Sequence, residues 1–220
     1  MQEYGISVIE FNDLLLNGDL NNLEKMADLI IHKGLYNVSW HGNFVVRKMS
    51  KQLIRKLRQA GLRGATFGLE SASPRLLKLM NKNVDLATAC SVIKEFAKAG
   101  VVVNVNWIIG FPGEKRQDLV ETAKFLFRHR KYILELSSIA ILAINSPSIL
   151  SKNTEQLKIN MGLNALDWSL EDNDLGERIH RRDAFLRFAQ GIYKLHPKSG
   201  LSSYFSARKL LKTFIRELYS

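Results

Sequence analysis

The stretch VVVNVNWIIGFPGE, residues 101–114, decides the fold of this 220-residue chain. It holds the longest apolar run in the sequence, which predicts a strand buried on both faces of a parallel sheet. Gly110, Pro112 and Gly113 follow the run, and two glycines around a proline predict a tight turn. We expect this turn to expose backbone N–H and C=O groups at the carboxyl end of the strand.

Short β-rich segments alternate with amphipathic helical segments on both sides of this stretch. The other predicted strands are residues 5–11, 36–41, 64–69 and 136–145, and the predicted helices are residues 21–34, 50–61, 73–80, 85–100 and 116–130. A period of roughly 30 to 40 residues is typical of strand–helix–strand units with parallel strands. The sequence therefore predicts an α/β fold, either a doubly wound sheet or a (β/α) barrel.

Residues at the helix ends support these boundaries. Ser50 is a candidate cap at the start of one helix, and Ser73-Pro74 suits the first turn of another. Gly34, Gly61 and Gly100 stand where helices are expected to stop.

The pattern changes near residue 150. Residues 151–174 are polar and irregular, with Trp168 as the expected anchor, and two amphipathic helices follow at 180–195 and 199–220. We expect a domain at 1–150 and a helical C-terminal extension at 151–220, with the first of these helices covering one end of the sheet.

Composition limits the classes of protein that the chain can represent. Its single cysteine, Cys90, excludes an intrachain disulfide, and no signal peptide or membrane-spanning run is present, so we expect a cytoplasmic protein. The net charge is +11, from 32 Lys and Arg against 21 Asp and Glu. Basic residues spread along helices, Arg178 and Arg181 among them, favour a solvated basic surface over a nucleic-acid site.

Polar residues gather where the predicted strands end, which is where (β/α) folds carry their chemistry. These residues are Asn12, Asp13, Asn17, His41, Asn43, Glu70, Ser71, Glu114, Asn145 and Ser146. Structural alternatives remain open for four of them. Asp13 is equally suited to capping a loop, His41 to packing beside Trp40, and Ser71 to starting a helix, whereas Glu70 needs either a partner or a ligand.

Five segments in this order resemble the radical S-adenosylmethionine superfamily, in particular its cobalamin (B12)-binding group. They are FNDLLLNGDL (11–20), WHGN (40–43), GLESAS (68–73), LLKLMNK (76–82) and IIGFPGE (108–114). The resemblance spans residues 5–145 and implies strands two to six of a partial (β/α) barrel, an incomplete TIM-like barrel.

The resemblance also implies cofactors and their binding residues. Family members hold a [4Fe–4S] cluster on a CxxxCxxC loop and cleave S-adenosylmethionine to a 5′-deoxyadenosyl radical, and this group also binds cobalamin. By position, Asn12 and Asp13 would lie near the methionyl amine, and Glu70 and Ser71 near the ribose and carboxylate. The turn Gly110, Phe111, Pro112, Gly113 and Glu114 would lie with Ile108 and Ile109 near the adenine, and His41 and Asn145 at the same edge.

The chain departs from the family in its cysteines. No CxxxCxxC is present, Cys90 is expected in a helix core, and NSPSIL (145–150) replaces a glycine- and threonine-bearing turn. We therefore expect a fragment that starts at the second strand, contains no catalytic residue or metal ligand of its own, and is inactive alone. A cluster-bearing N-terminal segment or partner chain would complete it.

Two other functions remain open. One is a non-catalytic remnant that binds a partner, or a second copy of itself, through the exposed strand edge. The other is a metal-dependent barrel hydrolase, for which only His41 among five histidines is near a strand end.

Overall fold

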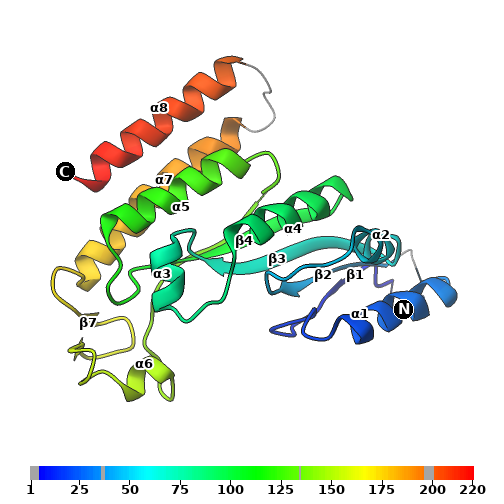
Figure 1. Cartoon of the computed structure of the whole chain (residues 1–220), viewed down its shortest axis with the longest axis horizontal. Coiled ribbons are helices and arrows are strands. Elements are labelled where there is room, and N and C mark those ends of the chain that lie inside the picture. Colours follow the sequence, from blue (N-terminus) through cyan, green and yellow to red (C-terminus); the bar gives the residue numbers. More distant parts are fainter. Residues whose placement is uncertain (1–4, 36–37, 134, 196–200) are drawn as a thin grey trace. The chain divides into compact units, whose positions relative to one another are not determined.

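The computed structural model describes residues 5–35, 38–133, 135–195 and 201–220. Five strands form one sheet in chain order, β1-β2-β3-β4-β5 (Figure 1). The strands are β1 (Val8–Glu10), β2 (Ser39–Phe44), β3 (Leu62–Glu70), β4 (Val102–Ile109) and β5 (Glu135–Ile141). β1 pairs with β2, and β2 with β3, in parallel. The α/β fold with a parallel sheet that the sequence predicts is confirmed.

Helices connect consecutive strands of this sheet. They are α1 (Leu20–His32), α2 (Lys51–Gln59), α3 (Pro74–Leu79), α4 (Leu86–Lys98) and α5 (Arg116–His129). The predicted caps are confirmed. The Ser50 hydroxyl accepts a hydrogen bond from the Leu53 N–H at 3.0 Å, and Pro74 opens α3. Gly34, Gly61 and Gly100 have φ angles of 66°, 100° and 79°, so they end their helices in the left-handed region that glycine adopts at no cost.

The chain divides into two compact units that are each built from separate segments. The first unit holds residues 1–69, 84–106 and 131–137, and the second holds 70–83, 107–130 and 138–220. The expected domain boundary at residue 150 stays a prediction.

In the first unit, the buried face of the sheet packs on aromatic side chains. The Phe67 and Phe96 rings are 5.2 Å apart and edge-on, and Phe44 lies 5.4 Å from Phe96. The Trp40 indole donates to the Ala60 carbonyl at 2.8 Å, which satisfies its one polar atom in the core.

The other face of β4 corrects the prediction of a strand buried on both sides. Burial alternates along β4, with Val103, Val105 and Trp107 buried while Asn104 and Asn106 remain half-buried. The number of apolar residues in residues 101–110 does not reveal this alternation, because valine and isoleucine occupy positions on both faces of the strand. The half-buried asparagines on the second face show that the described residues do not bury β4 completely on both sides.

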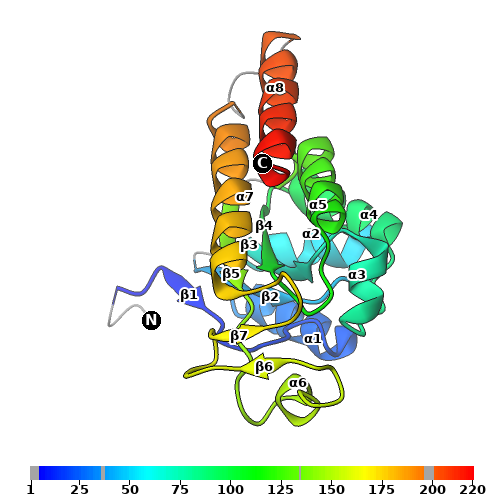
Figure 2. The same cartoon turned by 90° about the vertical axis from the view of Figure 1, so that its left-hand side faces the viewer.

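In the second unit, three helices pack together: α5, α7 (Leu175–Leu195) and α8 (Leu201–Leu218) (Figure 2). Trp107 at the end of β4 lies 6.0 Å from the Phe185 ring of α7, and Phe185 lies 6.0 Å from Phe214 of α8. The expectation that the first C-terminal helix covers one end of the sheet is therefore refined: α7 packs on α5, α8 and the last part of β4.

Residues 149–170 are more regular than predicted. They contain α6 (Ile149–Lys152) and an antiparallel pair, β6 (Asn160–Met161) with β7 (Trp168–Ser169). Trp168 is the anchor that the sequence predicts, since it is 2% exposed and packs with Ile144 and Ile159. Across the described residues, every helix is too short or too polar to cross a membrane.

Candidate functional site

The predicted site residues lie in both units, so we describe them in two groups. Asn12, Asp13 and His41 belong to the first unit. Glu70, Ser71, residues 108–114 and Asn145 belong to the second. All of them belong to or follow the strands of one sheet.

In the first unit, Asn12 and Asp13 are exposed in the loop that follows β1. Asp13 does not cap α1; that cap is Asp19, which accepts from the N–H groups of Asn21 and Asn22. The carbonyl of Asp13 accepts from the Asn43 side chain at 3.2 Å, which ties this loop to β2. The side chains of Asn12 and Asp13 therefore remain available to a ligand.

Asn17 has a structural role in the same loop. It is fully buried, and its amide exchanges two 2.8 Å hydrogen bonds with the backbone N–H and carbonyl of Val45. This polar residue closes the loop onto the exit of β2.

His41 lies inside β2, because the strand continues to Phe44 and WHGN does not follow it as the sequence suggested. Its side chain is 43% exposed, and Nδ1 lies 3.7 Å from the Glu10 carboxylate. A Cβ at Gly64 would lie 3.1 Å from the His41 ring, so glycine on β3 makes room for the imidazole.

In the second unit, Glu70 ends β3 in a strained conformation. Its φ angle is 68°, which a non-glycine residue adopts only at a cost, and its carboxylate pairs with the Lys82 ammonium at 3.0 Å. The next residue, Ser71, is buried, and its hydroxyl lies 3.2 Å from that of Thr122. Glu70 therefore has an internal partner, and Ser71 belongs to the packing between strand end and α5.

Both backbone groups of Gly110, at the start of the turn after β4, are hydrogen-bonded within the protein, which corrects the prediction that this turn exposes them. The Gly110 N–H donates to the Glu114 carboxylate at 2.8 Å, and the Gly110 carbonyl accepts from the Asn173 amide at 3.2 Å. Of the residues expected beside the adenine, Ile109 and Pro112 are buried, whereas Ile108 and Phe111 are half-buried. Asn145, which follows β5, is exposed.

Glu114 is the most perturbed group of this turn. Its side chain is 2% exposed, and burial raises the pKa of Glu114 to about 7, although the Gly110 N–H and the Arg181 guanidinium oppose the rise. Arg181 lies 3.9 Å from the carboxylate and donates to the Glu114 carbonyl at 3.3 Å.

Two arginines of α7 were counted from sequence as surface charges, and the structure buries both. Arg178 is fully buried, stacks 3.7 Å from the centroid of Trp168, and donates to three backbone carbonyls of residues 166–173. A Cβ at Gly110 would lie 2.2 Å from the Arg178 side chain, so glycine is required there. Helical periodicity gave no reason to single these arginines out, because the partners of Arg178 are loop carbonyls and those of Arg181 are carboxylates that include Glu114.

A second network links α3 to α5, and its centre, Asp118, was also missed. The buried Asp118 carboxylate accepts from the Ser73 hydroxyl at 2.6 Å, from the Lys115 N–H at 2.7 Å and from the Arg75 guanidinium. Arg75 donates as well to the Gly113 carbonyl at 2.7 Å. The segments that follow β3 and β4 are thereby fixed to each other.

The residues present do not fit an iron–sulfur cluster. Cys90 is half-buried on α4, and among residues 5–35, 38–133, 135–195 and 201–220 no three His, Cys, Asp or Glu side chains gather closely enough to bind a metal ion. Iron–sulfur clusters are held by several cysteine thiolates, and one cysteine does not supply them.

Comparison with known proteins agrees with this architecture. The model of the Radical SAM superfamily matches residues 13–126, more than half of the chain. An uncharacterized methyltransferase, PH0819, of Pyrococcus horikoshii is 31% identical over 123 residues, which cover 56% of this chain and 27% of that protein.

Solved structures show the same fold. OxsB, a cobalamin-dependent S-adenosylmethionine radical enzyme with aqua-cobalamin and S-adenosylmethionine bound, superimposes with a TM-score of 0.65 at 14% identity, covering 99% of this chain and 40% of OxsB. The radical S-adenosylmethionine methyltransferase TsrM of Kitasatospora setae gives 0.57 at 14% identity, covering 64% of this chain and 26% of TsrM.

This chain thus spans less than half the length of each of these relatives. The match of the family model includes the ends of β2, β3 and β4 and the turn at residues 110–114. On these grounds, the chain belongs to the radical S-adenosylmethionine superfamily.

Proposed function

We propose that this chain is the S-adenosylmethionine-binding part of a radical enzyme whose cluster cysteines lie on another polypeptide segment. The observation that carries the proposal is the family match over residues 13–126, which takes in Asp13, His41, Glu70, Ser71 and the turn after β4. Asn145 and Asn12 flank this range at strand ends of the same sheet.

The proposed roles of these residues follow from the family resemblance. Asn12 and Asp13 offer exposed acceptors for the methionyl ammonium. By the family resemblance, Glu70 and Ser71 would face the ribose and carboxylate, and a ligand would then have to compete with Lys82 for Glu70 and with Thr122 for the buried Ser71 hydroxyl. Ile108 and Ile109, with the turn from Gly110 to Glu114, would form the apolar side of the adenine pocket. The strain at Glu70 supports a binding role, because such conformations persist where surrounding structure holds them for a purpose.

The missing cluster limits what the 220 residues do alone. A [4Fe–4S] cluster held by another segment would supply the electron for reductive cleavage of S-adenosylmethionine. With one cysteine, this chain has no means of holding it. We therefore propose that the isolated chain is inactive, and that cobalamin-dependent methyl transfer in a reducing, cytoplasmic setting is the reaction of the completed enzyme.

Equilibrium dialysis with radiolabelled S-adenosylmethionine tests the binding proposal on the chain itself. We expect saturable binding that weakens at least tenfold in Asp13→Ala and in Glu70→Ala. Glu121→Ala, a matched carboxylate change on α5, should bind as the wild type does. Absence of saturable binding at millimolar ligand would contradict the proposal.

A second arm tests the proposed chemistry. The test needs a polypeptide that carries CxxxCxxC, from the upstream reading frame or from a partner gene. This polypeptide is mixed anaerobically with the chain, iron and sulfide to reconstitute the cluster. We expect brown absorption and reductant-dependent formation of 5′-deoxyadenosine, both absent with the chain alone. Cluster assembly without cleavage of S-adenosylmethionine would show that the function is wrong.

A specific observation favours a second candidate function, a partner-binding half-barrel. β1 is the first strand in the order of the sheet, no other described strand pairs with its outer edge, and Ile6 and Val8 near this edge are 46% and 57% exposed. An open edge invites pairing with another strand. This function predicts that the chain does not bind S-adenosylmethionine and that it elutes from a size-exclusion column as a homodimer or a complex. Elution as a monomer at every salt concentration would contradict it.

A further inference from the structure

The turn at residues 110–114 is held by side chains that come more than 60 residues later in the chain. These side chains belong to the loop before α7 and to α7 itself, and the turn lies in the same compact unit. The family model matches residues 13–126, so they lie outside the matched segment. Three of them, Asn173, Arg178 and Arg181, lie against the start or the end of the turn.

Asn173 holds the first two carbonyls of the turn. It is 3% exposed, and its amide nitrogen lies 3.2 Å from the Gly110 oxygen and 3.4 Å from the Phe111 oxygen. One amide group therefore fixes the orientation of two consecutive peptide planes. The Asn173 Oδ1 atom is buried and has no hydrogen-bond partner among the residues that the structure describes, so this amide acts only through its donors.

Arg178 fills the space beside Gly110. A Cβ at Gly110 would overlap the Arg178 side chain, and the Gly110 φ angle of 84° is one that glycine adopts without strain. Arg178 is itself fixed, because it is fully buried, stacks on Trp168 and donates to three loop carbonyls. The start of the turn and this arginine are therefore shaped to each other.

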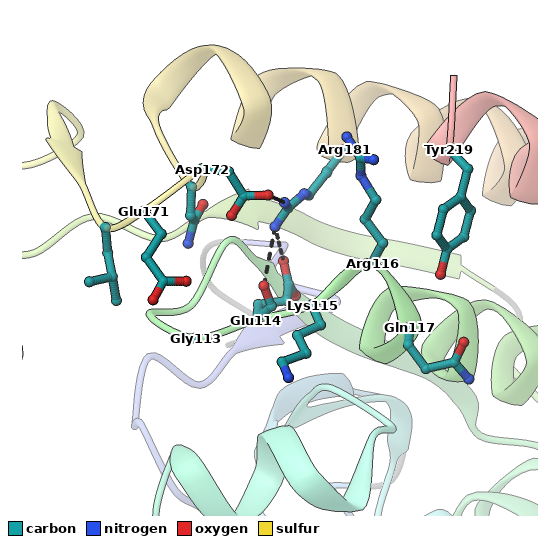
Figure 3. A pocket seen from close by; sticks show the side chains of 11 residues that line it. Gly113, Glu114, Lys115, Arg116, Gln117, Glu171, Asp172, Arg181 and Tyr219 are labelled. Carbon is teal, nitrogen blue, oxygen red and sulfur yellow. Dashed lines mark hydrogen bonds and ion pairs between the residues drawn. The ribbon is translucent and has the colours of Figure 1, made fainter.

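Arg181 holds the end of the turn, as Figure 3 shows. Its guanidinium donates to the Glu114 carbonyl at 3.3 Å and lies 3.9 Å from the Glu114 carboxylate. That carboxylate accepts from the Gly110 N–H at 2.8 Å, so the contacts run from α7 through Glu114 back to the first residue of the turn. Glu177, one helical turn before Arg181, accepts from its Nε at 2.8 Å and orients the guanidinium.

These contacts occupy the acceptors of the turn and leave two donors open. The carbonyls of Gly110, Phe111 and Glu114 accept from Asn173 and Arg181, and the Gly113 carbonyl accepts from an arginine of α3. Within the described part of the chain, the N–H groups of Phe111 and Gly113 have no hydrogen-bond partner. The turn therefore presents backbone donors in an arrangement that the C-terminal residues set.

We infer that Asn173 and Arg181 are positioning residues of the S-adenosylmethionine site, so that the C-terminal segment sets the affinity of this site for the adenosyl part of the ligand. The inference rests on the proposed function, in which the turn lies beside the adenine. Both residues act through the turn and need no contact with the ligand. A turn without these contacts has more conformations to lose when a ligand binds, and this loss lowers affinity.

Equilibrium dialysis of the full chain with radiolabelled S-adenosylmethionine tests the inference. Asn173→Leu keeps the size of the side chain and removes both donors, and Arg181→Ala removes the contacts with Glu114. We expect each change to raise the dissociation constant by about fivefold or more. Arg181→Lys, which keeps a cation, should restore part of the lost affinity.

Competition by unlabelled adenosine shows which part of the ligand is affected. The label is kept far below its dissociation constant, so that the half-displacing concentration reports the affinity for adenosine. This concentration should rise in Asn173→Leu by the same factor as the dissociation constant of S-adenosylmethionine. In Asp13→Ala, at the proposed methionyl end, it should stay at the wild-type value.

Two control variants separate positioning from stability. Arg187→Ala removes an arginine of the same helix whose partner is Glu217, and Asp85→Ala removes the cap of α4 in the other unit. Both variants should keep the wild-type dissociation constant, including where urea unfolding shows that stability has fallen. Circular dichroism confirms that each variant is folded in the dialysis buffer.

The outcomes distinguish this inference from the function on which it rests. A wild-type chain that binds, with folded Asn173→Leu and Arg181→Ala variants that bind equally well, would overturn the inference and leave the proposed function standing. Absence of binding by the wild type would overturn both. If Arg181→Ala does not fold, Asn173→Leu decides, because it removes only the two amide donors.

Discussion

Glu114 is held in surroundings that disfavour its charge. It is 2% exposed, and its carboxylate accepts from the Gly110 N–H at 2.8 Å with Arg181 at 3.9 Å. Because burial outweighs these contacts, the pKa of Glu114 rises to about 7, and the folded protein keeps a proton that an unfolded chain would lose near pH 4.5.

The raised pKa predicts that stability falls as pH rises. Below about pH 4.5 both states hold the proton, and between that pH and about 7 only the folded state holds it. The free energy of unfolding should therefore decrease by about 3 kcal/mol across this range on account of Glu114. Urea unfolding at pH 4.5, 6 and 8 measures the change. Glu114→Gln should remove most of this dependence of the unfolding free energy on pH. A variant with the same pH dependence as the wild type would contradict the assignment to Glu114.

Asp118 shows how a buried charge is retained by its partners. Although burial would raise the pKa of Asp118, hydrogen bonds from Arg75, Ser73 and the Lys115 N–H outweigh it and lower that pKa. We expect Asp118→Ala to destabilise the protein by about 2–4 kcal/mol, because it leaves the donors of two helix starts unpaired.

Two comparisons by urea unfolding check the role of Asp118. Arg75→Ala should cost less than Asp118→Ala, since the carboxylate keeps two donors. Glu121→Ala, on the same helix, should change stability by no more than about 0.5 kcal/mol. Equal effects of Asp118→Ala and Glu121→Ala would show that the network contributes nothing.

The contacts of the candidate site residues were harder to predict than the positions of these residues at strand ends. The strand-end positions of Glu70, Ser71 and Glu114 followed from the alternation of strands and helices. Their partners did not, because Lys82, Thr122 and Arg181 are 12, 51 and 67 residues away in the chain. Periodicity reports which face a residue occupies and says nothing of which distant residue lies opposite.

At the scale of elements, local chemistry was sufficient to place most helices. Ser50, Pro74 and the glycines at 34, 61 and 100 act within a few residues of themselves, so their effect is readable from sequence. β6 and β7 were missed because strands of two residues have no periodicity to read.

The cap of α4 gives a prediction at this scale. The Asp85 carboxylate accepts from the N–H groups of Ala87 and Thr88 and from the Thr88 hydroxyl. Asp85→Ala should lower the free energy of unfolding, whereas Asp85→Asn, which keeps an acceptor, should lower it much less. Thermal unfolding at pH 7 compares the two variants, and an Asn variant as unstable as the Ala variant would argue against capping.

For the whole molecule, the important feature is that neither compact unit is a continuous segment. The chain passes between the units inside β3, β4 and β5 as well as before α4 and after α5. The helical C-terminal residues also supply core to the second unit, since Phe185 lies against Trp107 and Phe214 against Phe185.

This organisation predicts that residues 1–150 do not fold alone. Truncation after residue 150 removes α7 and α8 and exposes Trp107, which the whole chain buries completely. We expect loss of near-ultraviolet circular dichroism, a red shift of tryptophan emission and binding of a hydrophobic dye. Cooperative unfolding of the 1–150 fragment would contradict this and support a domain boundary there.

The interleaving of the two units also sets when a newly made polypeptide gains its stability. Phe44 and Phe67 must wait for Phe96 to leave the ribosome, and Trp107 must wait for Phe185. The Trp107 ring therefore stays in contact with water while residues 108–185 are synthesised. Nascent forms of this chain should therefore depend on chaperones that hold apolar segments, and slowing translation should lower its yield rather than raise it.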